Sequence, residues 1–184
     1  MNTLTGTGNL VRLILRRDRL LMPLWILFLC LIPISFVTSF AELFPTAAAR
    51  QAYADVSADN AAFVTLYGRL FGSSLGEMVA WRAGFMPVMI GLVSLLTVIR
   101  YTRTDEEAGR RELLGSTVVG RHAGLAAALV ATLGANVVLA VLLALTMISQ
   151  GLSAAGSLAF GAELAAAGWV FAAIRVDPLY PADR

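Results

Sequence analysis

Four long apolar segments, separated by polar connections, dominate the chain. The first covers residues 21–40 without a charge, the second covers 79–99 with one arginine, and the third covers 123–149, again without a charge. A shorter fourth segment, 157–174, contains Glu163. Because a helix needs roughly 20 apolar residues to cross a bilayer, the pattern predicts about four transmembrane helices. The expected fold is an all-α polytopic membrane protein with a single transmembrane domain over residues 1–184.

The composition supports a membrane location and excludes some chemistry. Hydrophobic residues make up 58% of the chain and charged residues 14%, and the mean hydropathy is +0.77. A soluble core of this size cannot bury so much apolar surface. The net charge of +2 gives no support for nucleic-acid binding. All fourteen basic residues are arginine, so the lysine of a phosphate-binding loop is missing and this chain has no nucleotide-binding motif of that type.

The distribution of arginine predicts the orientation of the spans. Four arginines precede the first span, and five lie in the connection over residues 100–122. The connection over residues 41–78 holds two, and the one after the third span holds none. Arginine is enriched on the cytoplasmic side of membrane proteins. We therefore expect a cytoplasmic N-terminus, a cytoplasmic loop at 100–122 and an extracytoplasmic loop at 41–78.

Residues 8–20 have the pattern of an amphipathic helix that lies in the membrane interface. Leu10, Leu13 and Ile14 fall on one face, and arginines recur on another. The alternative is an ordinary basic flank of the first span. In the outer loop, helical patterns cover residues 46–53 and 60–67, separated by a break, and their aromatic residues suit a cap on the membrane surface. The expected interface anchors are Arg12, Arg16, Arg19, Trp81 and Arg82.

The connection between the second and third spans is the most polar part of the chain. Thr104 followed by Glu107 matches a capping box, so a short helix is expected to begin there. Glu106 and Arg110 form a pair with the favourable i, i+4 spacing, and Gly115 can end the helix. The alternative is that any cytoplasmic loop is polar. A short helix with a charged face suits docking onto a soluble partner.

The same residues carry a family resemblance. The segment "RYTRTDEEAGRRELLGSTVVGRHA", preceded by "AWRAG" and an apolar span, resembles the first cytoplasmic loop of bacterial ABC-2-type permeases. More narrowly, it resembles the actinobacterial exporters of polyketide antibiotics and other drugs. The opening "LVRLILRRDRLLMPLWIL" is similar to the connecting helix and first span of that family. The resemblance implies a coupling helix whose ATPase-docking residues are Thr104, Glu106, Glu107, Gly109, Arg110, Glu112, Leu113 and Leu114.

The resemblance implies a membrane subunit of an ABC exporter in the bacterial plasma membrane. Such a subunit moves hydrophobic or amphipathic compounds out of the cell, binds no cofactor itself and relies on a separate ATPase subunit that holds ATP and magnesium. The other expected partners are a further permease chain or half, membrane lipids and a small hydrophobic substrate, with no nucleic acid. Permeases of this type usually have six spans per half, and this chain has about four. A truncated, non-transporting membrane scaffold is therefore the alternative.

Other classes of function find less support in the residues. An ion-coupled carrier needs ionisable groups within its spans, and only Arg82 and Glu163 qualify. Both are expected near the outer ends of their spans, where Arg82 serves as an anchor and Glu163 is either solvated or paired with Arg82. An intramembrane enzyme lacks a recognisable motif here, and His122 stands alone at a membrane boundary. Cys30, the single cysteine, is expected to pack as a small hydrophobic residue, and no metal site is expected.

Overall fold

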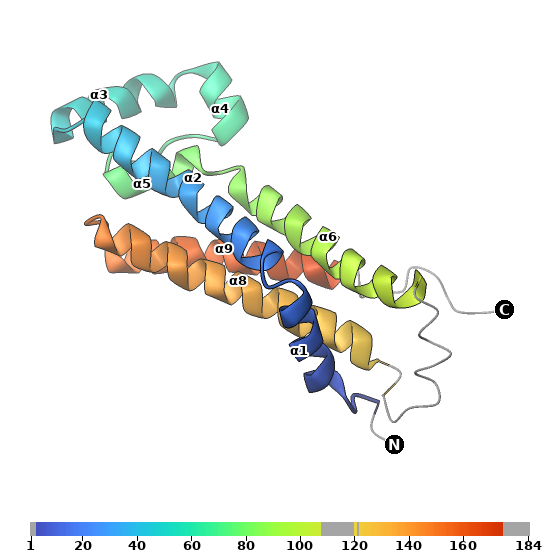
Figure 1. The fold of residues 1–184 in the computed structure, drawn as a ribbon. Helices are drawn as coiled ribbons and strands as arrows, with labels where there is room; N and C mark the ends of the chain where they lie inside the picture. Colours follow the sequence, from blue (N-terminus) through green and yellow to red (C-terminus); the bar gives the residue numbers. More distant parts are fainter. Residues whose placement is uncertain (1–2, 108–119, 121, 175–184) are drawn as a thin grey trace.

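The computed structural model describes residues 3–107, 120 and 122–174, with residues 103–107 described by their backbone only. The regular elements of the described part are all helices, with no strand among them, so the all-α expectation is confirmed. Figure 1 shows the long helices side by side in an elongated bundle. The four longest helices are α2 (Leu21–Leu43), α6 (Met86–Glu107), α8 (Ala123–Ser149) and α9 (Ala154–Ile174). The shorter ones are α1 (Thr7–Arg17), α3 (Ala47–Ala58), α4 (Ala61–Tyr67) and α5 (Leu75–Arg82).

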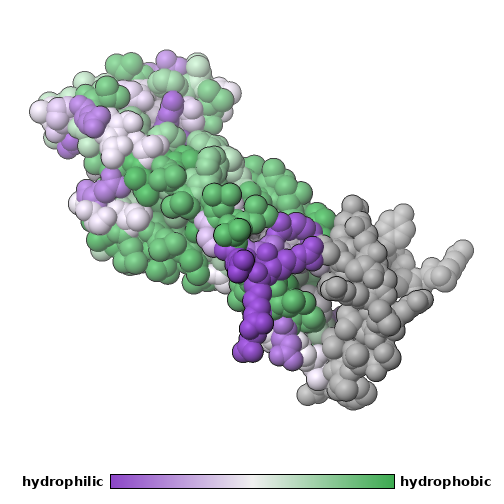
Figure 2. Space-filling view, viewed as in Figure 1, coloured by the Kyte–Doolittle hydropathy of each residue, from purple (hydrophilic) through white to green (hydrophobic). Residues whose placement is uncertain are grey.

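Several helices of the bundle are long and apolar enough to cross a membrane. Among the described residues, α2, α8 and α9 meet this condition separately, and α5 and α6 meet it together as one bent span. The outward surface of the bundle is apolar, as the green surface in Figure 2 shows. It includes the exposed side chains of Leu24, Leu27, Phe28, Leu31, Val137, Val141 and Leu145. Because such a surface needs lipid around it, the chain is a multi-pass membrane protein.

The second span differs from the expected continuous helix over residues 79–99. It divides into α5 and α6, which meet at an angle of 49°. In the break, the N–H of Gly84 bonds to the carbonyl of Trp81 at 3.1 Å, and the N–H of Met86 bonds to that of Ala83 at 2.8 Å. A Cβ on residue 84 would lie 3.1 Å from the Trp81 carbonyl oxygen. Glycine therefore permits the tight turn that interrupts the span.

The outer loop forms a helical cap, as its sequence pattern predicts. Thr46 accepts a hydrogen bond from the N–H of Ala49, and Asn60 accepts from the N–H groups of Ala62 and Phe63. These side chains satisfy backbone donors that lack a partner at the start of α3 and α4. Figure 1 shows α3 and α4 together at one end of the bundle. The α8–α9 turn lies at the same end, because a Cβ on Gly76 of α5 would lie 3.7 Å from a methyl carbon of Leu152.

Helix α1 lies at the opposite end of the bundle and contacts α8 (Figure 1). It ends at Arg17, so Arg19 lies in the turn before α2 instead of in the helix expected over residues 8–20. The expected apolar face also divides, because Ile14 packs against the core while the Leu13 side chain is 54% exposed. Because α1 packs against the end of α8, the side chains on one side of α1 are buried and those on the other side are exposed.

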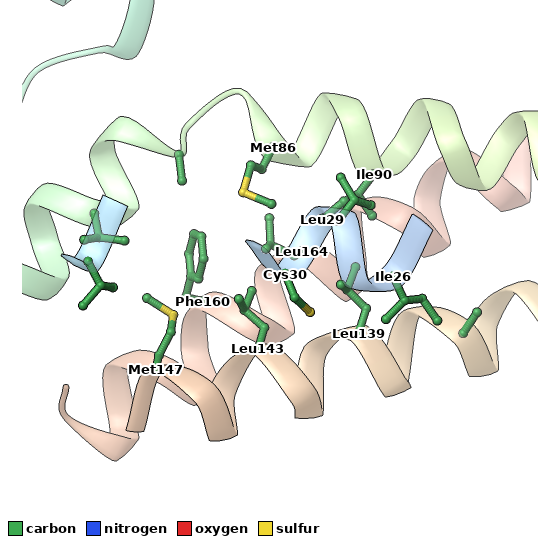
Figure 3. Close-up of a cluster of buried hydrophobic side chains, with 14 of the residues drawn as sticks. Ile26, Leu29, Cys30, Met86, Ile90, Leu139, Leu143, Met147, Phe160 and Leu164 are labelled. Carbon is green, nitrogen blue, oxygen red and sulfur yellow. The ribbon is translucent and has the colours of Figure 1, made fainter. Parts of the chain in front are cut away.

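The core lies between the four spans. Figure 3 shows apolar side chains from α2, α6, α8 and α9 directed toward one another. The labelled residues are Ile26, Leu29, Cys30, Met86, Ile90, Leu139, Leu143, Met147, Phe160 and Leu164. Cys30 is 5% exposed in this cluster, in agreement with its expected packing role.

Candidate functional site

A buried carboxylate joins the α1–α2 turn to α6. Asp18 is 6% exposed, and it accepts a hydrogen bond from the hydroxyl of Tyr101 and forms an ion pair with Arg100. The guanidinium of Arg100 also lies 5.2 Å from the centre of the Tyr101 ring. A carboxylate removed from water needs such donors to remain charged. The ion pair and hydrogen bond therefore fix the N-terminal helix to the end of the second span.

Sequence reasoning did not identify Asp18 as a functional residue. It is the one acid in the run "RRDR", within the stretch expected to form the interfacial helix. Its real partners lie more than 80 residues away in the chain. The sequence feature that could have identified it is a single carboxylate at the predicted boundary of a span, where a buried carboxylate needs a cationic or hydrogen-bonding partner.

The expected helix start at Thr104 is wrong. Helix α6 continues from Met86 to Glu107, so Thr104 lies inside a helix. At the preceding turn, Thr102 donates to the carbonyl of Val98 at 3.0 Å. No glycine or proline lies between residues 92 and 107, so no helix-breaking residue ends α6 before Thr104. Within a helix the backbone N–H groups already have partners, so Thr104 has no unpaired N–H group to cap.

Most of the expected ATPase-docking residues lie outside the described residues. Thr104, Glu106 and Glu107 belong to the last turn of α6, described by its backbone. The others, Gly109, Arg110, Glu112, Leu113 and Leu114, fall beyond it. Their docking role stays a prediction. The structure does establish that α6 ends at the same end of the bundle as α1 (Figure 1).

The return of the chain to the bundle is also fixed at that end. The N–H of Gly120 donates to the carbonyl of Thr5 at 2.9 Å, and the N–H of His122 donates to that of Thr3 at 3.2 Å. A Cβ on Gly120 would lie 2.1 Å from the Thr3 carbonyl oxygen. The segment before α1 therefore pairs with the segment that enters α8, and only glycine fits this close approach.

A polar cluster lies buried in the middle of the bundle. The Asn136 amide donates to the Ser94 hydroxyl at 3.0 Å and to the Thr132 carbonyl at 3.1 Å. Asn136 and Ser94 are completely buried, and they join α8 to α6. A Cβ on Gly168 of α9 would lie 2.6 Å from the Asn136 amide group. The Asn136 side chain therefore contacts groups of three spans, α6, α8 and α9. Sequence reasoning missed it because a single asparagine does not change an apolar pattern.

Glu163 lies deeper in its span than expected. Helix α9 begins at Ala154 instead of residue 157, so Glu163 is its tenth residue of 21. At 1.5 Å per residue, this places Glu163 near the middle of the span instead of its outer end. Its side chain is exposed. Of its two expected environments, solvation or pairing with Arg82, the pairing is absent from the described residues, where Arg82 stacks on the Tyr67 ring at 4.5 Å.

Trp81 is directed into the protein. It is 8% exposed, its indole N–H donates to the Gly68 carbonyl at 2.8 Å, and its ring packs against Phe63 and Tyr67. This contact holds the loop after α4 onto α5, so Trp81 fastens the outer cap to the bent span. A role for Trp81 and Arg82 as membrane anchors stays a prediction.

An apolar cavity of about 780 Å³ lies between α1, α2 and α8. Val11 and Leu15 of α1 line one end of it. The other lining residues are Met22, Pro23, Ile26, Leu27, Cys30 and Ile34 of α2, and Val130, Ala131, Gly134, Ala135, Val138, Leu142 and Thr146 of α8. A cavity of this size can hold a small organic molecule.

Comparison with known proteins gives one informative match. No protein-family model matches the chain. The chain is 44% identical over 172 residues, or 92% of its length, to the multidrug efflux system permease protein of Mycobacterium tuberculosis. It spans 31% of the length of that curated relative. The expected resemblance to bacterial exporter permeases is confirmed: this chain is a multi-pass membrane protein that is similar, over almost its whole length, to the permease of an efflux system.

Proposed function

We propose that this chain forms part of the membrane subunit of an ABC exporter that moves hydrophobic or amphipathic compounds, such as antibiotics, out of the cell. A separate ATPase subunit supplies the energy and binds ATP and magnesium. The curated relative is named as the permease of a multidrug efflux system, which supports the substrate class and the direction. The spanning helices supply the membrane path.

The observation that carries the mechanism is the continuity of α6. This helix extends from the buried core at Met86 to Glu107, the beginning of the proposed docking segment over residues 104–114. Near its end, Tyr101 and Arg100 bind Asp18. A displacement of the docking segment would therefore move α6 as a rigid body. Through the contacts of Asp18, it would also move α1 and α2. Such a continuous packed element can carry a coupling between two sites.

The proposal is tested by the ATP hydrolysis that co-purifies with the tagged chain from its native membranes. Reversing two charges of the docking segment, with Glu107→Arg and Arg110→Glu, should remove most of this activity while the chain still inserts. The matched control is Asp59→Arg, a charge reversal on an exposed residue of the outer cap. Equal ATPase recovery with the wild type and the double variant would contradict docking at this segment.

A second test concerns Gly109. If residue 109 contacts no partner, Gly109→Ala should stabilise the helix, because glycine costs near 1 kcal/mol of helix propensity relative to alanine. If a partner surface approaches closely at residue 109, the same change should weaken ATPase coupling and leave insertion intact. We expect the second result. Full coupling with Gly109→Ala and with Gly109→Leu would mean that this face contacts no partner.

The position of Glu163 favours an ion-coupled carrier as the second candidate. An exposed carboxylate near the middle of a span is costly in lipid and is often functional. Transport by a carrier would continue without ATP and would collapse when the proton gradient is dissipated. Export that stops on ATP depletion, with the gradient held constant, would favour the ABC exporter instead.

A further inference from the structure

The cavity between α1, α2 and α8 offers almost no polar group to a ligand. Thr146 supplies the only side-chain hydroxyl among the lining residues, and this hydroxyl already donates to the carbonyls of Leu142 and Leu143 at 2.9 Å. An apolar cavity of this kind does not hold ordered water. A drug-like ligand usually needs a few polar groups to orient it. The walls therefore suit a plain hydrocarbon chain.

The cavity is elongated along α8. On this helix its lining runs from Val130 to Thr146, which are 16 residues apart, or about 24 Å at 1.5 Å per residue. This length lies within the roughly 30 Å hydrocarbon thickness of a bilayer. A single acyl chain is narrower than a helix, which is about 10 Å across, and can lie along the whole groove.

Two arginines of α1 lie next to the residues with which this helix covers the cavity. Arg12 and Arg16 directly follow Val11 and Leu15, the two α1 residues in the lining. They are four residues apart, so their side chains lie on one face of the helix. Both are exposed, and neither forms an ion pair within the described part of the chain. Figure 2 shows the hydrophilic surface of this region beside the apolar surface of the bundle.

The nearby acid does not neutralise these arginines. Asp18, at the end of α1, is held by Arg100 and Tyr101 on α6. Guanidinium groups bind phosphate strongly and through several hydrogen bonds. Two of them beside an apolar groove at the membrane surface therefore favour an anionic headgroup.

We propose that the groove between α1, α2 and α8 is a binding site for an anionic phospholipid. One acyl chain lies along α8 and is covered by Val11 and Leu15, and the phosphate is held by Arg12 and Arg16. The bound lipid fills the space between α1 and the spans, so it joins the interfacial helix to the bundle. This site is independent of the proposed export function and of the ATPase.

Photolabelling of the full chain in phosphatidylcholine vesicles tests the site. The probes are phosphatidylglycerol and phosphatidylcholine that each carry a diazirine in one acyl chain. Phosphatidylglycerol should label peptides of α2 and α8 that line the groove, about tenfold more strongly than phosphatidylcholine, because two arginines attract its headgroup. Labelling spread evenly over the lipid-facing sides of the spans would overturn the site, and so would equal labelling by the two probes.

Two sets of variants separate the tail contact from the headgroup contact. Gly134→Leu should abolish groove labelling by filling the cavity, since no atom lies within 4 Å of a Cβ at this position. Val137→Leu, on the same helix but outside the lining, is its control and should label normally. Arg12→Gln with Arg16→Gln should keep the groove labelled but reduce the preference for phosphatidylglycerol to near one, whereas Arg69→Gln should not. Retention of the preference in the double arginine variant would overturn the headgroup assignment.

A competition experiment distinguishes a lipid site from a substrate site. Tetraphenylphosphonium, a hydrophobic cation, should not displace the phosphatidylglycerol label, because the arginines repel it. Displacement of the label from α2 and α8 would identify the groove as a site for exported compounds and overturn the phospholipid assignment. Circular dichroism of each variant confirms that it has folded.

Discussion

The carboxylate of Asp18 accepts a hydrogen bond from the hydroxyl of Tyr101, 83 residues further along the chain. Both residues are buried, at 6% and 8% exposure, and Arg100 completes the set with an ion pair to the same carboxylate. The bond joins the turn between α1 and α2 to the last turns of α6. These elements should therefore move together, which makes the contact the structural link between the N-terminal helix and the polar loop.

Removal of this carboxylate should destabilise the chain. We expect Asp18→Ala to lower the free energy of unfolding by about 2–3 kcal/mol, the usual cost of losing a hydrogen bond to a charged group. The ion pair adds less, because the Arg100 side chain is 42% exposed. Tyr101→Phe should cost less than Asp18→Ala, since the Asp18–Arg100 pair remains.

Denaturant titration in detergent micelles measures this effect. Asp59→Asn, at an exposed acid of the outer cap, is the control and should stay within about 0.5 kcal/mol of the wild type. If Asp18→Ala has no larger effect than the control, the contact does not hold α1 to the bundle.

Three glycines of α8 and α9 should respond differently to alanine. At Gly161 a Cβ would lie 2.6 Å from the backbone carbonyl oxygen of Ala140, and at Gly168 it would lie 2.6 Å from the Asn136 side chain. At Gly134 it would meet no atom within 4 Å. Gly161→Ala should therefore cost about 1–3 kcal/mol, as overpacking typically does, because a helix backbone cannot move aside easily.

Gly168→Ala should have an intermediate effect. The Asn136 side chain can rotate away, but it then loses the Ser94 hydroxyl. Gly134→Ala should be neutral or slightly stabilising, because alanine favours a helix. Thermal unfolding of the three variants in one detergent gives the order, and equal loss at all three positions would contradict the close packing of α8 on α9.

The hydrogen bond between Asn136 and Ser94 should contribute modestly to stability. Interhelical hydrogen bonds in membrane proteins average about 0.6 kcal/mol and reach about 1.7 kcal/mol. We expect Asn136→Ala to lie at the upper end, because its amide bonds to both Ser94 and the Thr132 carbonyl. A double-mutant cycle with Ser94→Ala isolates the coupling between the two side chains. A coupling energy of zero would show that the two side chains contribute independently.

The orientation in the membrane can be tested with fused reporters. A reporter inserted after Asp59, between α3 and α4, should be external, and one inserted at Gly115 should be cytoplasmic, because arginines flank the latter. A reporter at Gly151 should behave as at Asp59, since the α8–α9 turn and the cap share one end of the bundle. The opposite result would reverse the orientation and exclude docking of a cytoplasmic ATPase at residues 104–114.

The sequence by itself determined the class of fold and the local elements. Long uncharged segments predicted α2, α8 and α9 because a bilayer requires such lengths of apolar helix. Helical patterns over residues 46–53 and 60–67 predicted the two helices of the outer cap. Their starts are set locally by Thr46 and Asn60, since a capping side chain bonds to backbone N–H groups only two or three residues away. These features depend on neighbours in sequence or on lipid, so no knowledge of the packed bundle was needed.

The tertiary structure decided the features that depend on distant partners. The second span bends at Gly84, where the turn packs closely beneath the outer cap, although its apolar pattern is continuous. Asp18 stands among arginines in the sequence, but its partners, Tyr101 and Arg100, come from α6. Thr104 matched a helix start, but the helix that precedes it does not stop. Periodicity and capping describe contacts within a few residues, whereas a buried charge, a bend and a groove arise only when separate helices come together.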